Sequence, residues 1–276
     1  MSTAVALLLV FALAALAELY RRRTASINGQ TQRLLESAKP TVRRAMPASG
    51  LPPPVARYLR LTLGERRQPP PRLMHLTQQG LLRTDLSSDR WLDFNADHIA
   101  APLSNSFLWN AKVRIAPLVH VRVIDSLIDG VGSGEVHWMS TFEVAHASAT
   151  PEVNSGSLHR FLAEAVWYPW ALMPSDHLSW APIDDTRALA TLSVHGTSVS
   201  LEFRFARSGE VSGIFTPARW GRFGARYLQA AWEGEFRDYR EFDGLLLPSE
   251  ASVGWHRDGE LKLVWVGHVD AAFQEL

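Results

Sequence analysis

The most constraining feature of this sequence is an alternation of apolar and polar residues with a period of two. It begins after Arg72 and is broken at short intervals by turn residues such as Gly80, Pro102 and Pro117. Strands with one buried and one exposed face produce this alternation. No regular helical pattern alternates with the strands, which argues against a parallel α/β sheet. We therefore predict a mainly β (α+β) protein with about ten antiparallel strands.

The clearest hairpins lie in the second half of the chain. Residues 188–195 and 197–205 are joined across Gly196, and 210–216 follows the next turn. The strands predicted at 227–239, 246–255 and 261–269 are separated by two Asp-Gly pairs, which favour tight hairpin turns. The glycine-rich stretch 130–134 lacks the lysine of a phosphate loop and the spacing of a nucleophile elbow, so we interpret it as another turn.

One predicted helix interrupts the strands, from Ser157 as its cap to Pro169 as its end. Its apolar stripe follows helical spacing and consists of Leu158, Phe161, Leu162, Ala165, Val166 and Pro169. Arg160, Glu164 and Trp167 form a second line at i, i+4 and i+7. This spacing allows an ion pair between Arg160 and Glu164.

The N-terminal segment contains 14 consecutive apolar residues at 4–17, and three arginines follow at 21–23. We predict a retained transmembrane anchor over residues 1–20, a basic linker over 21–50 and the β domain over 51–276. The alternatives are a signal peptide cleaved after the small residues 15–17, which would lack the usual basic start, and a buried apolar helix.

The charges are distributed unevenly along the chain. Between Arg21 and Arg72 there are 12 Lys and Arg against two Glu, whereas residues 73–276 have 16 basic and 25 acidic residues. The positive-inside rule then predicts a single-pass protein of the cell membrane with its domain on the cytoplasmic side. The basic segment is either a contact with membrane lipids, at about 1 kcal/mol per charge, or a solvated linker that only sets topology. We expect no nucleic acid partner, because these charges adjoin a membrane segment.

Four segments carry a resemblance to a family of uncharacterised bacterial proteins with a domain of unknown function, of the DUF6544/DUF6920 type. They are LPPPVARYLR from Leu51, GSLHRFLAEAVWYPWALMP from Gly156, the turn at 183–185 and the turn at 243–248. The resemblance implies a fold similar to the lipoprotein-carrier half-barrels, in which a curved antiparallel sheet wraps around helices and leaves an apolar cleft. It implies no assigned activity.

The candidate ligand-binding residues all belong to the predicted helix and the segment after it. We expect Arg160, Glu164 and Trp167 to face the cleft and hold the polar end of an apolar ligand, and Trp170 and Met173 to form a wall. The alternative is a structural ion pair that seats the helix on the sheet.

The composition excludes several kinds of site. There is no cysteine, so disulfides, thiolate metal sites and cysteine nucleophiles are absent. The ten histidines show no zinc-binding spacing, and we predict neither a metal nor a cofactor. We assign no catalytic residue, and interpret Asp184, Asp185, Glu233 and Glu235 as solvated carboxylates.

These patterns favour a noncatalytic protein that shelters a hydrophobic, amphipathic or lipid-like ligand in a half-barrel cleft at the membrane. Two alternatives stay open: an enzyme that uses cleft carboxylates such as Glu164 or Asp184, and a membrane-associated adaptor with an exposed apolar patch. The oligomeric state is not encoded in these patterns.

Overall fold

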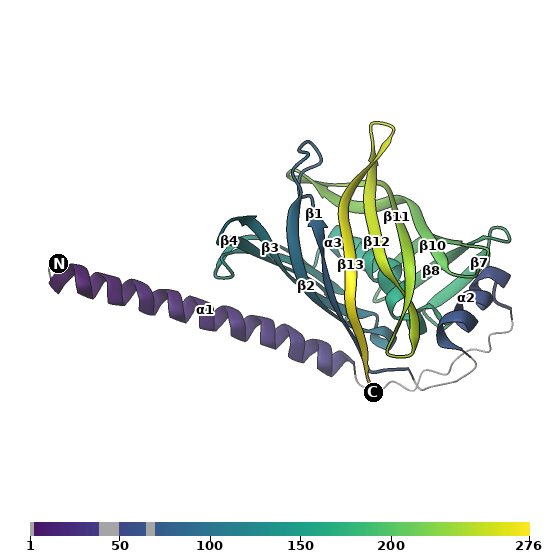
Figure 1. Cartoon of the computed structure of the whole chain (residues 1–276), viewed down its shortest axis with the longest axis horizontal. Helices are drawn as coiled ribbons and strands as arrows, with labels where there is room; N and C mark the ends of the chain where they lie inside the picture. The colour runs from purple at the N-terminus through teal and green to yellow at the C-terminus, as the bar shows by residue number, and fades with distance from the viewer. Residues whose placement is uncertain (1–2, 39–49, 65–69) are drawn as a thin grey trace.

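A single antiparallel sheet dominates the computed structural model, which describes residues 3–38, 50–64 and 70–276 (Figure 1). Its 13 strands are β1 (Leu73–Leu82), β2 (Leu92–Ala101), β3 (Ser106–Ala116), β4 (Val119–Ile128), β5 (Val131–Trp138), β6 (Phe142–Ser148), β7 (Leu178–Pro182), β8 (Arg187–Val194), β9 (Thr197–Phe205), β10 (Val211–Phe223), β11 (Arg226–Phe242), β12 (Leu245–Arg257) and β13 (Glu260–Glu275).

The strand order is that of two meanders joined in the middle. The first runs from β1 to β6 and the second from β7 to β13, and β1 pairs with β13 from Leu73↔Glu275 to Leu82↔Trp265. The two edges of the sheet are therefore β6 and β7, which are consecutive strands in the chain. The tight turns at Gly196, Gly244 and Gly259 have positive φ, as the sequence predicts for these hairpins.

The connection between the two edges contains the helix α3 (Pro151–Glu164), followed by the short helices η2 (Ala165–Trp167) and η3 (Pro169–Leu172). Its residues 158–172 are buried except for Arg160 and Glu164, and α3 contacts β4, β5, β9 and β10. We call the side of the sheet that it covers the inner face. In Figure 1, α3 lies behind the strands β1 and β13.

The helix α2 (Pro53–Leu63) completes the packed half of the inner face. Its first turn carries prolines, which lack the amide hydrogen that a first turn leaves unpaired. The Tyr58 hydroxyl donates a hydrogen bond of 3.1 Å to the carbonyl oxygen of Val166, and the ring is 1% exposed. The helix α2 and the segment after α3 therefore share one core.

The helix α1 (Thr3–Ser37) runs through both the predicted anchor and the first part of the predicted linker. Its second half packs on the opposite, outer face, where Leu34 meets Leu108 and Ile124, and Gln30 donates to Glu135 at 2.7 Å. Its first half extends away from the sheet (Figure 1). Within the described residues, no helix is long and apolar enough to cross a membrane. The expectation of a transmembrane helix over 1–20 is not supported by this finding.

The predicted fold class is confirmed in its main part: mainly β, one large curved antiparallel sheet and a few helices. Several details were wrong. Over the described residues, the sheet has 13 strands, not about ten. The helix begins at Pro151, because Thr150 caps it by accepting a hydrogen bond from the amide of Val153, and it ends at Glu164, before Pro169. The predicted turn is present only at Gly130; the stretch from Val131 to Gly134 belongs to β5, and a Cβ at Gly132 would lie 2.7 Å from Ser157 Oγ. This glycine lets α3 cross the sheet closely, so it does not mark a turn.

Candidate functional site

An ion-pair cluster lies where α3 crosses the middle of the inner face. Arg160 donates to Glu164 at 2.8 Å and to Asp125 of β4 at 2.7 Å. Its guanidinium also lies over the rings of Phe107 and Trp109, at 5.1 and 4.9 Å from their centroids. The side chains of Arg160, Glu164 and Asp125 are 18%, 16% and 37% exposed. The cluster is thus largely withdrawn from water, with one carboxylate reaching the solvent.

Burial dominates the electrostatics of this cluster. It raises the pKa of the Glu164 and Asp125 carboxyls, and the charge of Arg160 acts against it in both. For Arg160 itself, burial is outweighed by its two carboxylate partners, so its pKa is raised. The charged pairs are held together by mutual attraction in a site that disfavours each charge alone.

Arg219 and His98 complete the cluster. Arg219 of β10 lies over the rings of Trp232 and Trp255 and donates to the carbonyl oxygen of Gly156 at 3.0 Å. Burial and the charge of Arg160 lower the pKa of Arg219 to about 10. Among the described residues, its Nε has no hydrogen-bond partner although it is buried. His98 is fully buried with Nδ1 3.7 Å from Glu164 Oε2, and burial lowers its pKa well below the ordinary value.

The five residues predicted to bind a ligand are close in the chain but have different surroundings. Arg160 and Glu164 form the predicted ion pair. Trp167 is 3% exposed and donates from Nε1 to the carbonyl oxygen of Pro248 at 2.9 Å. Trp170 is 5% exposed within the same core, and Met173 is partly buried against it. Whether these residues bind a ligand stays a prediction.

Sequence analysis missed Asp125, His98 and Arg219. Each lies on a different strand; His98 and Asp125 lie in regularly paired parts of β2 and β4, whereas Arg219 directly follows an irregularity in the pairing of β10. Only the pairing of strands and the crossing of α3 bring them to Arg160. No local signal in the sequence marks them.

Beyond the cluster, the inner face continues as a wall of partly exposed apolar side chains. In β4, Val123 and Val121 share the side of Asp125, and they pair with Val136 and Trp138 of β5. The residues of this inner wall are Leu82, Leu92, Val121, Val123, Val136, Trp138, Phe223, Leu228, Val253 and Trp265. Trp138 and Leu228 are 42% and 41% exposed.

Glycines allow the indole rings of this wall to lie flat on the sheet. A Cβ at Gly267 would lie 2.1 Å from the ring of Trp265, and one at Gly221 would lie 2.5 Å from the ring of Trp255. Trp265 also contacts Phe94 and Trp167. The inner wall is therefore continuous with the core that anchors α3.

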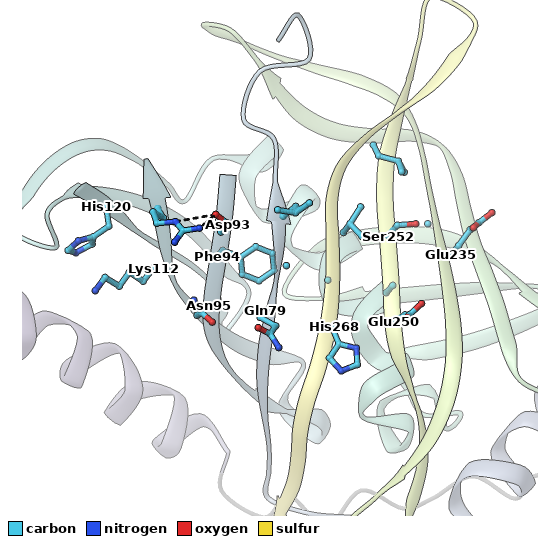
Figure 2. Close-up of a pocket in the computed structure, with 18 of the residues that line it drawn as sticks. Gln79, Asp93, Phe94, Asn95, Lys112, His120, Glu235, Glu250, Ser252 and His268 are labelled. Atoms are coloured by element: carbon cyan, nitrogen blue, oxygen red, sulfur yellow. Dashed lines mark hydrogen bonds and ion pairs between the residues drawn. The ribbon is translucent and has the colours of Figure 1, made fainter. Parts of the chain in front are cut away.

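The outer face carries a cavity of about 1330 Å³, shown in Figure 2. Its lining mixes polar and charged side chains with apolar ones, and it spans β4, β3, β2, β1, β13, β12 and β11. A smaller cavity of about 290 Å³ adjoins it and shares Asn95 and Lys112. We call the two together the outer groove. None of the five predicted ligand-binding residues lines it.

One group in the described part of the chain has a spacing that could hold a metal ion. Glu135, His137 and Glu143 place three ligand atoms within 4.8 Å of one another, on the outer face of β5 and β6. Gln30 donates to Glu135, and His137 Nε2 lies 3.0 Å from the same carboxylate. These contacts already tie α1 to β5, so the group has a structural role.

These features define the class of the protein: a single antiparallel sheet whose inner face is crossed by a helical connection between its two edges. The chain belongs to the Family of unknown function (DUF6544), whose model matches residues 40–266. No curated protein matches it.

Three solved structures are similar in outline. A LolA superfamily protein from Nitrosomonas europaea is 7% identical with a TM-score of 0.40, covering 81% of this chain and 92% of its own. A putative outer membrane lipoprotein-sorting protein domain from Vibrio parahaemolyticus is 7% identical with a TM-score of 0.39, covering 73% and 85%. A β-barrel-like protein of a domain of unknown function (DUF1849) from Brucella abortus is 8% identical with a TM-score of 0.22, covering 74% and 98%. No function is transferred from likenesses of this degree.

Proposed function

We propose that this protein is a noncatalytic binding protein for an apolar or amphipathic, lipid-like ligand, which lies on the inner wall. The observation that supports the proposal most is the partial exposure of large apolar side chains on that wall, led by Trp138 and Leu228. A soluble surface seldom leaves a contiguous apolar face of this kind without a partner. The occupant is therefore a molecule that removes this surface from water.

The ion-pair cluster gives the proposed site a polar end. Arg160 of α3 bonds Asp125, which lies two residues from Val123 on the same side of β4, and the buried Nε of Arg219 has an unused hydrogen among the described residues. An amphipathic ligand would direct its head toward these groups and its tail along the wall. Because both carboxylates of the cluster are already paired with Arg160, Arg219 is the cation that favours an anionic or hydrogen-bond-accepting head.

The first test is binding of a series of saturated fatty acids to the full chain, followed by tryptophan fluorescence. Each methylene buried contributes about 0.8 kcal/mol, so two added carbons should tighten binding about tenfold until the wall is filled. Saturable binding with an affinity that does not depend on chain length would contradict the proposal. The absence of binding of any fatty acid or phospholipid would also contradict it.

A matched pair of variants locates the site. Val123→Asp places a charge on the inner wall and should weaken binding by at least tenfold, because the carboxylate loses water when a tail covers it. Val266→Asp places the same charge on the outer face, where the side chain is 37% exposed, and should leave affinity unchanged. Equal effects of the two variants would exclude the inner wall as the site.

We further propose that the first half of α1 holds the protein at a membrane surface. Val10, Phe11 and Leu13 are 62%, 71% and 65% exposed, and basic residues follow at Arg21 and Arg22. Exposed apolar and basic groups in this order suit insertion beside anionic lipid headgroups. Flotation with phosphatidylglycerol vesicles tests this proposal, and Phe11→Asp should abolish flotation.

We also propose that the β domain lies on the cytoplasmic side, where anionic headgroups attract the basic residues that follow the apolar segment. Protease added to intact spheroplasts should then leave the domain uncut. Cleavage from outside would contradict this orientation.

A further inference from the structure

The outer groove is a second site, which the proposed function does not use. It lies on the side of the sheet opposite to α3, so it is separated from the inner wall by the sheet itself. Its volume of about 1330 Å³ exceeds the roughly 300–1,000 Å³ of most small-molecule pockets. An extended ligand suits this size better than a compact metabolite.

The floor of the groove is a row of polar side chains that crosses five strands. Lys112 of β3 pairs with Asn95, Asn95 with Gln79, Gln79 with His268, and His268 with Glu250 of β12. Paired residues of antiparallel strands share one face. Figure 2 shows Asn95, Gln79 and His268 between Lys112 and Glu250.

The two ends of this row carry opposite charges. Two ion pairs lie beside the row, Arg114 with Asp93 and Arg237 with Glu235, while Arg122, opposite Lys112, donates to Ser140 and Asn110. Within the described residues, no ion pair involves Lys112 or Glu250. The row therefore offers one unpaired cation and one unpaired anion, separated by four inter-strand spacings, or about 19 Å along the sheet.

The three side chains between these charges are hydrogen-bonding groups. Gln79 donates to Asp270 at 2.7 Å, which leaves its carbonyl oxygen as an acceptor. Asn95 offers both a donor and an acceptor, and His268 offers ring nitrogens. Together these groups can donate to and accept from the amide groups of a polypeptide backbone.

We propose that the outer groove binds an extended peptide segment that carries an acidic side chain near Lys112 and a basic side chain near Glu250. An extended chain advances about 3.3 Å per residue, so about six residues span the two charges. Residues six positions apart point to the same side of an extended chain. A fatty acid offers only one charge and no backbone amides, so it does not fit this row.

The test uses the full chain and a fluorescein-labelled nonapeptide of serine and threonine, with aspartate at its second position and lysine at its eighth. Fluorescence anisotropy should show saturable binding that weakens as salt is added. Lys112→Glu and Glu250→Lys should each reduce affinity about five- to tenfold, since each reversal replaces an attraction with a repulsion. The double variant should bind a nonapeptide with the two charges exchanged.

The control is the double variant Arg226→Glu with Glu241→Lys, which changes two exposed residues outside the groove. Its net charge equals that of the unmodified protein. It should bind the original peptide as the unmodified protein does. Absence of saturable binding at millimolar peptide, or equal losses in the control, would overturn the proposal. Tight binding of a neutral serine-threonine nonapeptide would also overturn it, because the charges would then have no role.

Fatty acid binding to the inner wall should be unchanged in Lys112→Glu. A wrong proposal for the outer groove is therefore distinguishable from a wrong proposal for the inner wall.

Discussion

Removal of the guanidinium of Arg160 should destabilise the folded protein strongly, and Arg160→Met is the most direct perturbation. Methionine keeps an unbranched apolar stem, but it removes the guanidinium that lies over Phe107 and Trp109 and leaves Glu164 and Asp125 without their cation. The variant therefore leaves both carboxylates in place without the charge that pairs them.

The magnitude follows from the surroundings of each partner. Removing one member of a buried ion pair costs about 3–5 kcal/mol, because the other charge stays buried. Glu164, at 16% exposed, matches that case, whereas Asp125, at 37% exposed, is screened by solvent and adds about 0–1 kcal/mol. We expect a loss of about 3–6 kcal/mol in the free energy of unfolding. The midpoint of thermal unfolding should fall by roughly 6–24 °C for a chain of this size.

Urea denaturation at pH 7, followed by tryptophan fluorescence, measures this loss. Arg114→Met is the matched control, since the exposed pair of Arg114 with Asp93 should contribute about 0–1 kcal/mol. Adding Glu164→Gln to Arg160→Met should recover at least half of the loss, because an amide can stay buried without a counterion. A loss below about 1 kcal/mol in Arg160→Met, or no recovery in the double variant, would contradict the prediction. Glu164 would then not be a buried carboxylate that needs the charge of Arg160.

Three further predictions concern groups of the inner face. Burial lowers the pKa of His159 from 6.5 to about 4. The unfolded chain therefore binds more protons between these values, and stability falls as pH falls, by up to about 3 kcal/mol. His159→Gln should make the unfolding free energy depend less on pH between pH 7 and pH 4, and an unchanged slope would contradict this. Tyr58→Phe leaves the carbonyl of Val166 without its donor and should cost about 1–3 kcal/mol in urea denaturation, whereas no loss would show that water replaces the hydroxyl. Gly221→Ala should displace the ring of Trp255 and alter near-ultraviolet circular dichroism, and an unchanged spectrum would contradict the close approach.

The sequence contained enough information for the fold class because alternation in strands is a local property. The hairpin of 188–195 with 197–205 agrees within a residue with β8 and β9, because Gly196 fixes the turn. The strand number was underestimated, about ten against 13 in the described chain, partly because glycines in β5 look like a turn. Those glycines serve a contact with α3 that only the assembled fold creates.

The site was less accessible to sequence reasoning. The pairing of Arg160 with Glu164 follows from helical spacing and is present. The third partner, Asp125, is 35 residues away on β4, and nothing in its neighbourhood marks it. The row from Lys112 to Glu250 depends on the pairing of β1 with β13, which joins residues almost 200 positions apart. Single-sequence patterns do not encode such registers.

The passage of α3 between the two edges of the sheet sets a geometric limit. If the sheet is regarded as an arc, the segment from β6 to β7 is its chord, and the 14 residues of α3 provide about 21 Å of it. A rigid chord fixes how far the arc can spread, so a helix lengthened by one turn would open the curve by about 5 Å. The curvature of the sheet is thus coupled to the length of one helix.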